Sequence, residues 1–262
     1  YTWPGLVQDC GVENLQLVSE YDKNNPKDED HRWMGIVIDN ASNSWVKQVS
    51  FKHFAGSVVA LYSNASKITV EDCIALAPVS EIGGQRRISF FTEGQQTLFQ
   101  RCYTEDAIHG FATGFCTPGP TAFVQCEAIN ALGFSGGLDS WSSGVLFDVV
   151  NIDGNAISLL NRGQDGQGAG WNMANSVLWN CSAARIDNYQ PPGAQNWAFG
   201  SWSQLAGDGY WYESNNHLQP RSLFYAQLKE RLQNLLDTRQ QVLEIGTEAS
   251  SSPSVEVAMA LT

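Results

Sequence analysis

Carboxyl groups dominate the central part of the chain, which is where its chemistry is expected to lie. Residues 88–184 carry eight acidic side chains that stand out in strand ends and loops, but only two arginines and no lysine. Glycoside hydrolysis usually needs two carboxyl groups, one to protonate the leaving oxygen and one to activate water or attack carbon. We select Asp139 and Asp165 as this pair, and Glu105 and Asp106 as the acids held in reserve.

One histidine and three arginines complete the predicted site. His109 follows two acids and precedes Gly-Phe, so that a neighbouring carboxylate would keep it titrating near neutral pH as a proton carrier. Arg162 stands between Asn and Gly and would hold a sugar hydroxyl or carboxylate through two hydrogen bonds, or else form a salt bridge between coils. Arg86 and Arg87, the basic pair nearest to this region, are predicted to bind substrate.

Tryptophans in glycine-rich contexts are the candidate sugar platforms, because an aromatic face packs against the C–H face of a pyranose. Trp141, Trp171 and Trp202 are assigned to substrate binding on this ground. The same residue types also serve core packing, which is the competing interpretation.

Net charge and hydropathy limit the classes of partner that this chain is expected to bind. The net charge of −12 argues against nucleic acid and anionic membranes, since phosphate binding depends on Lys and Arg. No apolar run is long enough to cross a bilayer, so we expect no membrane insertion. Spacing typical of zinc ligands is absent, and we expect no metal and no cofactor, except for Ca²⁺ if the reaction is an elimination. The expected partner is a polysaccharide or oligosaccharide.

A repeated phrase of four to six residues indicates the elements that must position these side chains. Four copies end in Cys73, Cys102, Cys126 and Cys181, and two further copies were aligned on Phe51 and Val149 (Val46–Phe51, Ile68–Cys73, Thr97–Cys102, Ala122–Cys126, Leu146–Val149 and Val177–Cys181). The aligned positions are 22, 29, 24, 23 and 32 residues apart. Short β-branched and aromatic strands at such a period cannot bury one face alone and must stack on their neighbours.

The predicted fold is therefore all-β: a single-stranded, right-handed parallel β-helix. Leucine-rich repeats share the period but need a regular Leu pattern, which is not visible. In such a solenoid the cysteines stack inside as small apolar residues, which we favour over a disulfide framework. Cys10 and Cys116 lie outside the repeat, and either pair or stay free.

The repeat fades after about residue 200, which sets the expected domain organisation. Residues 1–221 are predicted to form the β-helix, and 222–240 an amphipathic C-terminal helix that closes the end of the solenoid. Residues 241–262 are interpreted as a linker or tail that leads to, or is a fragment of, a further domain of the same polypeptide.

Beyond these patterns, the chain resembles the pectate-lyase-like superfamily of right-handed parallel β-helices. More narrowly, it is similar to a little-characterised group of secreted bacterial carbohydrate-active β-helix proteins, over about Trp33 to Leu232. The stretches that carry this similarity are Pro78–Gly84, Gly119–Phe123, Asn161–Gly163, Gly168–Trp171, Ala194–Gly200 and Pro220–Leu223. The resemblance implies activity on polysaccharides and a secreted, periplasmic or cell-surface location.

Departures from that group keep several functions open. Where the group has Arg-His-Asp-Phe, this chain has Ile108-His109-Gly110-Phe111, so that only His109 remains of an ionisable cluster. The leading hypothesis is a glycoside hydrolase with paired carboxylates. The alternatives are a polysaccharide lyase acting on a glycan that contains uronic acid, and a noncatalytic carbohydrate-binding or adhesin-like β-helix.

Overall fold

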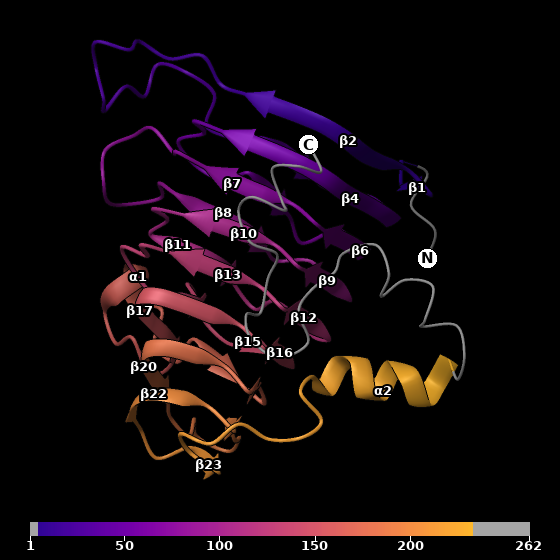
Figure 1. The fold of residues 1–262 in the computed structure, drawn as a ribbon, viewed down its shortest axis with the longest axis vertical. Coiled ribbons are helices and arrows are strands. Elements are labelled where there is room, and N and C mark those ends of the chain that lie inside the picture. Colours follow the sequence, from indigo (N-terminus) through magenta and orange to yellow (C-terminus); the bar gives the residue numbers. More distant parts are fainter. Residues whose placement is uncertain (1–4, 233–262) are drawn as a thin grey trace.

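The computed structural model describes residues 5–232 and has the architecture of a parallel β-helix. Its strands stack coil upon coil, from β2 (Gly11–Val18) at the top of Figure 1 to β23 (Tyr210–Tyr212) at the bottom. All pairings in the 21-stranded main sheet are parallel, and each joins one coil to the next. The all-β solenoid expected from the repeat is confirmed.

The strands form three ladders, here named A, B and C. Ladder A contains β1 (Val7–Gln8), β6 (Ser66–Glu71), β9 (Thr97–Gln100), β12 (Thr121–Val124), β16 (Val145–Asp148), β19 (Val177–Trp179), β21 (Trp197–Phe199) and β23. Ladder B contains β7 (Ile74–Leu76), β10 (Tyr103–Glu105) and β13 (Glu127–Ile129). Ladder C contains β3 (Ile36–Ile38), β5 (Val59–Leu61), β8 (Ile88–Thr92), β11 (His109–Thr113) and β14 (Ser135–Gly137).

Long strands bend around the corners and join the ladders into one sheet. β2 and β4 (Ala41–Lys52) belong to ladders A and B, whereas β17 (Asn151–Leu159), β20 (Ser182–Asn188) and β22 (Trp202–Ala206) belong to ladders B and C. A separate two-stranded pair consists of β15 (Ser142–Ser143) and β18 (Met173–Ala174). The segment α1 (Asp165–Gly168) is a single short turn in the loop after β17.

The corner between ladders A and B is made by one residue with left-handed backbone in each coil. Short polar side chains tolerate this conformation best because they bond to nearby main chain. The residues in this column, which we call the A–B corner, are Asn14, Gln48, Asp72, Arg101, Gln125, Val149, Asn180 and Gly200. Val149, with φ of 57°, is the β-branched exception.

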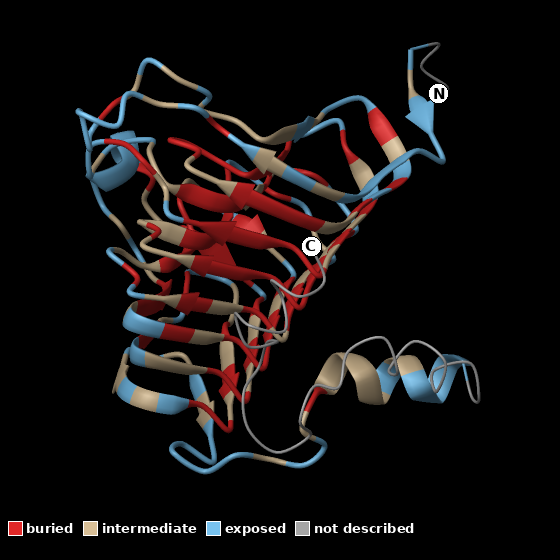
Figure 2. Ribbon diagram, turned by 45° about the horizontal axis from the view of Figure 1, so that its top comes forward, coloured by how far each residue is buried: buried red, intermediate tan, exposed pale blue. Residues whose placement is uncertain are grey.

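Inside the coils, equivalent residues stack in columns. Phe99, Phe123 and Phe147 occupy the same register position in β9, β12 and β16, with successive ring centroids 5.0 and 5.1 Å apart. All three are fully buried. Figure 2 shows this buried core running through the centre of the stack.

The cysteines form the next column, as predicted. Cys73, Cys102, Cys126 and Cys181 are free and buried, whereas Cys10 and Cys116 are free and exposed. Two positions of the sequence alignment are wrong, however. The strand register places Val49 and Val150 in the cysteine column, in place of Phe51 and Val149. The alignment is wrong at Val149 because this residue occupies the left-handed corner, and a valine gives no sequence signal for that backbone conformation.

The C-terminal helix α2 (Leu223–Leu232) exists but does not close the end of the solenoid. It lies beside the coils, as Figure 1 shows, and its first turn docks on β16. The buried carboxylate of Asp148 accepts hydrogen bonds from the Ser222 hydroxyl at 2.6 Å and the Phe224 amide at 2.7 Å. Burial raises the pKa of Asp148 to about 6. The expectation of an end cap is therefore wrong, because a buried carboxylate on the side of the coils holds the N-terminus of the helix.

The A–B corner supplies the other contacts of this C-terminal segment. Asn180 donates from its amide to the carbonyls of Leu218 and Arg221, both at 2.9 Å. Arg101, paired with Asp72, donates to the Tyr225 hydroxyl at 3.2 Å. None of the helical residues is fully buried, so that these polar contacts fix its position more than apolar packing does. Residues 233–240 of the predicted helix and the predicted tail 241–262 lie outside the described residues.

The aromatic column gives the first prediction. Phe123 is stacked between Phe99 and Phe147, so that Phe123→Ala leaves a cavity that rigid ladders on both sides cannot fill. We expect a loss of about 3 to 5 kcal/mol in the free energy of unfolding, measured by urea denaturation. Phe115→Ala, at a side chain that is 63% exposed, is the control and should change this free energy by less than about 1 kcal/mol. Equal losses in both variants would contradict the assigned core.

The docking of α2 on β16 gives the second prediction. Asp148→Ala removes the acceptor for Ser222 and Phe224, and we expect proteases to cleave between residues 218 and 232 faster than in the parent protein. Asp153→Ala, at an exposed strand position, is the matched control. Cleavage at the parent rate in the Asp148 variant would show that other contacts hold the helix.

Candidate functional site

The side chains that follow the strands of ladder C form the candidate site. Consecutive coils stack here through backbone hydrogen bonds from Glu93 to Leu61, from Gly114 to Thr92, and from Leu138 to Thr113, at 2.7, 2.9 and 2.9 Å. Residues next to these positions therefore line up along the solenoid axis at about 4.8 Å per coil. We call this row the acid–aromatic edge and define it by Tyr62, Glu93, Phe115, Asp139, Trp141 and Arg162.

Glu93 is the most unusual group of the edge. Its side chain lies over Gly114 of the next coil, where a Cβ would stand 2.6 Å from the Glu93 Cγ and 2.7 Å from its Oε1. Burial raises the pKa of the Glu93 carboxyl, and the nearby carboxylates of Asp139 and Asp39 raise it further, against a hydrogen bond from the Phe115 amide. Gly114 thus leaves the space that Glu93 occupies.

Asp139 follows β14, two coils beyond Glu93 along the axis. Burial raises the pKa of Asp139, and the positive charge of Arg162 opposes part of that rise. The Arg162 guanidinium donates to the Leu138 carbonyl and stands over the ring of Phe134, 5.1 Å from the centroid. The two acids therefore differ in their surroundings, since Asp139 has a cation beside it and Glu93 has two carboxylates.

His109 joins this group through Phe134. Its Nδ1 lies 2.6 Å from the Phe134 carbonyl oxygen, which can only accept, so that Nδ1 carries the proton. Burial lowers the pKa of His109 to about 4, opposed by that hydrogen bond and assisted by Arg162. The imidazole is therefore neutral at pH 7, and its role as a proton carrier near neutral pH does not follow from this environment.

Exposed aromatic side chains alternate with the acids. Tyr62, Phe115 and Trp141, on the coils of β5, β11 and β14, are 37%, 63% and 42% exposed. The amide of Trp141 donates to the Trp171 carbonyl at 2.8 Å, which places Trp171 on the following coil, where it is half-buried. The edge thus combines carboxyl groups with rings able to stack on sugars.

The structure brings together some of the predicted site residues and separates others. His109, Asp139, Arg162, Trp141 and Trp171 lie at or beside the acid–aromatic edge. Asp165 shares the loop of Arg162 but is exposed on the turn α1, where its amide donates to the Arg162 carbonyl at 3.0 Å.

Glu105 and Arg87 lie together at the other end of the coil, in a small hollow beside ladder B. Glu105 accepts a hydrogen bond from the Ala77 amide at 2.9 Å, and Arg87 donates to the hydroxyl and carbonyl of Ser80. Desolvation lowers the pKa of Arg87. Both side chains therefore stabilise local loops in this structure.

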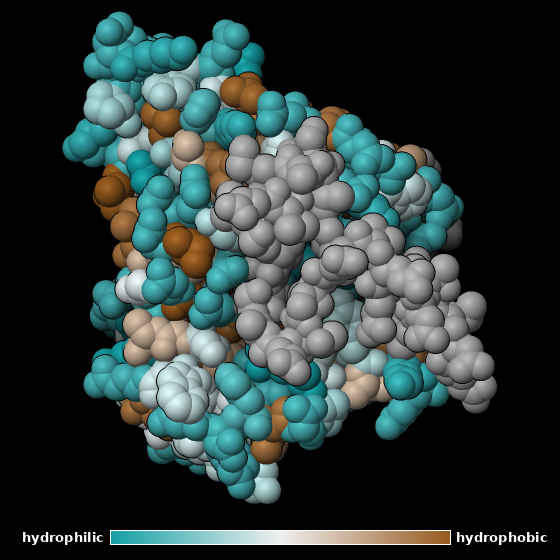
Figure 3. All heavy atoms as spheres, in the orientation of Figure 1, coloured by the Kyte–Doolittle hydropathy of each residue, from teal (hydrophilic) through white to brown (hydrophobic). Residues whose placement is uncertain are grey.

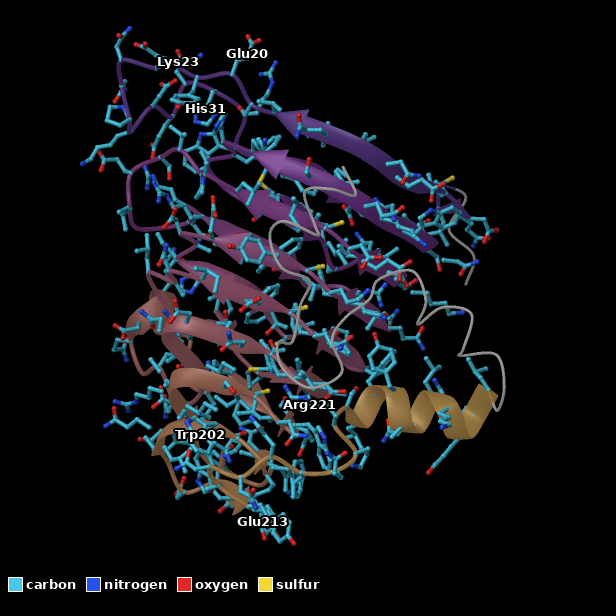
Figure 4. The ribbon with its side chains drawn as sticks, viewed as in Figure 1. Glu20, Lys23, His31, Trp202, Glu213 and Arg221 are labelled. Carbon is cyan, nitrogen blue, oxygen red and sulfur yellow. The ribbon has the colours of Figure 1, made fainter. Side chains whose placement is uncertain are left out.

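Arg86 and Trp202 lie further away still. Arg86 pairs with Glu29, in the loop between β2 and β3 whose hydrophilic surface is at the top of Figure 3, and stands over the Trp33 ring. Trp202 is 57% exposed on the last coils, and Figure 4 shows it at the opposite end of the solenoid from His31.

Sequence reasoning did not single out Glu93, Tyr62 or Phe115. Glu93 follows a strand directly, as Asp139 nearly does, but the two are separated by loops of unequal length. A signal did exist in the pairing of an acid after one strand with a glycine after the next, Glu93 and Gly114. Using it requires the strand register, which the sequence repeat located only for ladders A and B.

A metal-binding cluster and a membrane-spanning helix are both absent from the described residues. Within residues 5–232, no three His, Cys, Asp or Glu side chains gather closely enough to hold a metal ion. In the same range, neither helix has the length and apolar character required to span a bilayer.

Comparison with known proteins gives one match. Residues 209–262 match the model of a family described as a domain of unknown function (DUF6298). No curated protein and no solved structure matches the chain. The described part of the matched stretch contains β23 and α2. β23 is the last strand of ladder A, and the segment at the start of α2 contacts Asn180 of the A–B corner and Asp148 of β16.

The neutral state of His109 gives the third prediction. Its pKa is about 4 in the folded protein and near 6.5 when solvated, so the unfolded chain binds more protons between these values. The contribution of His109 to stability is therefore complete above pH 6.5 and is lost as the pH falls towards 4. We expect the stability difference between pH 7 and pH 5, measured by urea denaturation, to be smaller in His109→Gln. An unchanged difference would contradict the buried neutral imidazole.

Proposed function

We propose that this chain is a carbohydrate-active β-helix protein that hydrolyses a polysaccharide outside the cell, with Glu93 and Asp139 as its paired carboxyl groups. The observation that carries the proposal is the Glu93 carboxyl, desolvated over Gly114 and next to other carboxylates, in a row of exposed aromatic rings. Such a perturbed acid on an accessible surface is typical of a general acid.

The surroundings of the two acids assign their roles. Burial and the nearby carboxylates raise the pKa of Glu93, so we assign Glu93 as the acid that protonates the glycosidic oxygen as the C–O bond breaks. Burial also raises the pKa of Asp139, but the charge of Arg162 opposes that rise, so we assign Asp139 as the base that takes a proton from the water attacking the anomeric carbon. The products are two shorter glycans, with one proton transferred from Glu93 and one gained by Asp139.

The surroundings of the basic groups favour hydrolysis over elimination. A lyase needs a base to remove a proton next to a carboxylate, but Arg162 is bonded to Leu138 and stacked on Phe134. His109, with a pKa of about 4, is a weak base. A noncatalytic binding protein would use the same aromatic rings without the acids. It would bind the polymer and release no products, which distinguishes it from an enzyme.

The fourth prediction concerns the two acids. On a panel of pectin, xylan, alginate and hyaluronan, we expect release of reducing ends from at least one polymer without unsaturated ends. Glu93→Gln and Asp139→Asn should each lower that rate by about 100-fold or more, because each loses a proton-transfer group. Gly114→Ala should also lower it, since the added methyl displaces the Glu93 carboxyl.

Asp153→Asn, an exposed acid on β17 away from the edge, is the matched control and should keep the parent rate. Unsaturated ends would establish a lyase, and binding without products would establish a noncatalytic protein. If Asp165→Asn abolished the rate while Glu93→Gln did not, the pairing of Asp139 with Asp165 would replace the one proposed.

A further inference from the structure

A second surface feature lies on ladder A at the N-terminal coils. It is an open hollow with a volume of about 390 Å³, within the range of small-molecule sites. Its lining is mixed rather than apolar and comes from three neighbouring strands. The lining residues are Glu13, Asn43, Ser44, Trp45, Lys47, Lys67, Thr69 and Glu71.

Trp45 is held as a platform within this hollow. Its indole lies against Gly11 of the preceding coil, where any Cβ would collide with the ring. The indole Nε1–H donates to the Glu13 carboxylate at 3.2 Å, which fixes the ring's orientation. Trp45 nevertheless remains 38% exposed. A large ring that is fixed on one side and open on the other loses little conformational entropy on binding.

The two lysines beside this platform differ in their ion pairs. Lys47 pairs with Glu71 at 3.0 Å, and Glu71 also contacts Arg101 at 3.4 Å. Lys67 is exposed, and none of the ion pairs formed among residues 5–232 includes its ammonium group. The Lys67 ammonium beside this aromatic platform is a local positive charge that complements a carboxylate on a ligand.

We propose that the hollow around Trp45 and Lys67 is a binding site for a uronic-acid unit of a glycan. The pyranose face stacks on the Trp45 indole, the sugar carboxylate pairs with the Lys67 ammonium, and Thr69, the register partner of Trp45, faces the ring hydroxyls. This site does not depend on the proposed hydrolysis, because it lies on ladder A and shares no residue with the acid–aromatic edge.

The fifth prediction tests this site with trigalacturonate as the probe and cellotriose as its neutral counterpart, by isothermal titration calorimetry on the whole chain. Trigalacturonate should bind at least about tenfold more tightly than cellotriose, and added salt should weaken it. Trp45→Ala and Lys67→Gln should each weaken it by about tenfold or more. Lys229→Gln, at an exposed position on α2, is the matched control and should bind like the parent chain.

Circular dichroism and the urea midpoint establish that each variant is folded. Equal affinity for both sugars, unchanged binding in Lys67→Gln and Trp45→Ala, or no binding of trigalacturonate by the parent chain would each overturn the assignment. Because the readout is binding, loss of hydrolysis through Glu93 leaves this result unaffected, and the two proposals fail separately.

Discussion

The register of the parallel backbone hydrogen bonds between coils is the constraint on which the rest of this structure depends. Within each ladder the strands pair residue for residue, and the register shifts only between ladders B and C, in the pairs β17–β20 and β20–β22. A slip of one residue within a ladder would move inward side chains to the surface. One left-handed residue per coil keeps the A–B corner in phase. Loops of different length are therefore confined to the other corners, and every feature of the surface is a column of equivalent positions.

Columns explain how the candidate site arises from residues far apart in the chain. Glu93 and Asp139 are brought to one edge because the strands they follow belong to the same ladder. The residue between them is Gly114, so that the Glu93 side chain lies along the solenoid axis instead of pointing outward. Burial raises the pKa of both acids, but the charges beside them differ, because Arg162 lies near Asp139 whereas Asp139 and Asp39 lie near Glu93.

The C-terminal segment uses the same principle on another side of the molecule. Asp148 and Asn180 occupy neighbouring coils, and together they bind the chain from Leu218 to Phe224. A buried carboxylate satisfies the free amides at the start of α2, which apolar packing does not replace. The stretch that matches the family of unknown function is thereby joined to the solenoid through polar contacts.

The sequence by itself determined the parallel β-helix, its free buried cysteine column, the presence of a C-terminal helix and the acidic, aromatic character of the central coils. These follow from local strand patterns and from a repeat that recurs in the printed letters. It also pointed to Asp139, His109 and Arg162, because their loops follow recognisable strands. The alignment failed at Val49 and Val150, since corner geometry depends on one backbone angle that Val149 does not reveal. Only the tertiary structure decided that Glu93 lies over Gly114, that Glu105 belongs to another corner, and that α2 docks on the side. Each depends on which coils are neighbours, and loops of unequal length remove that information from the sequence.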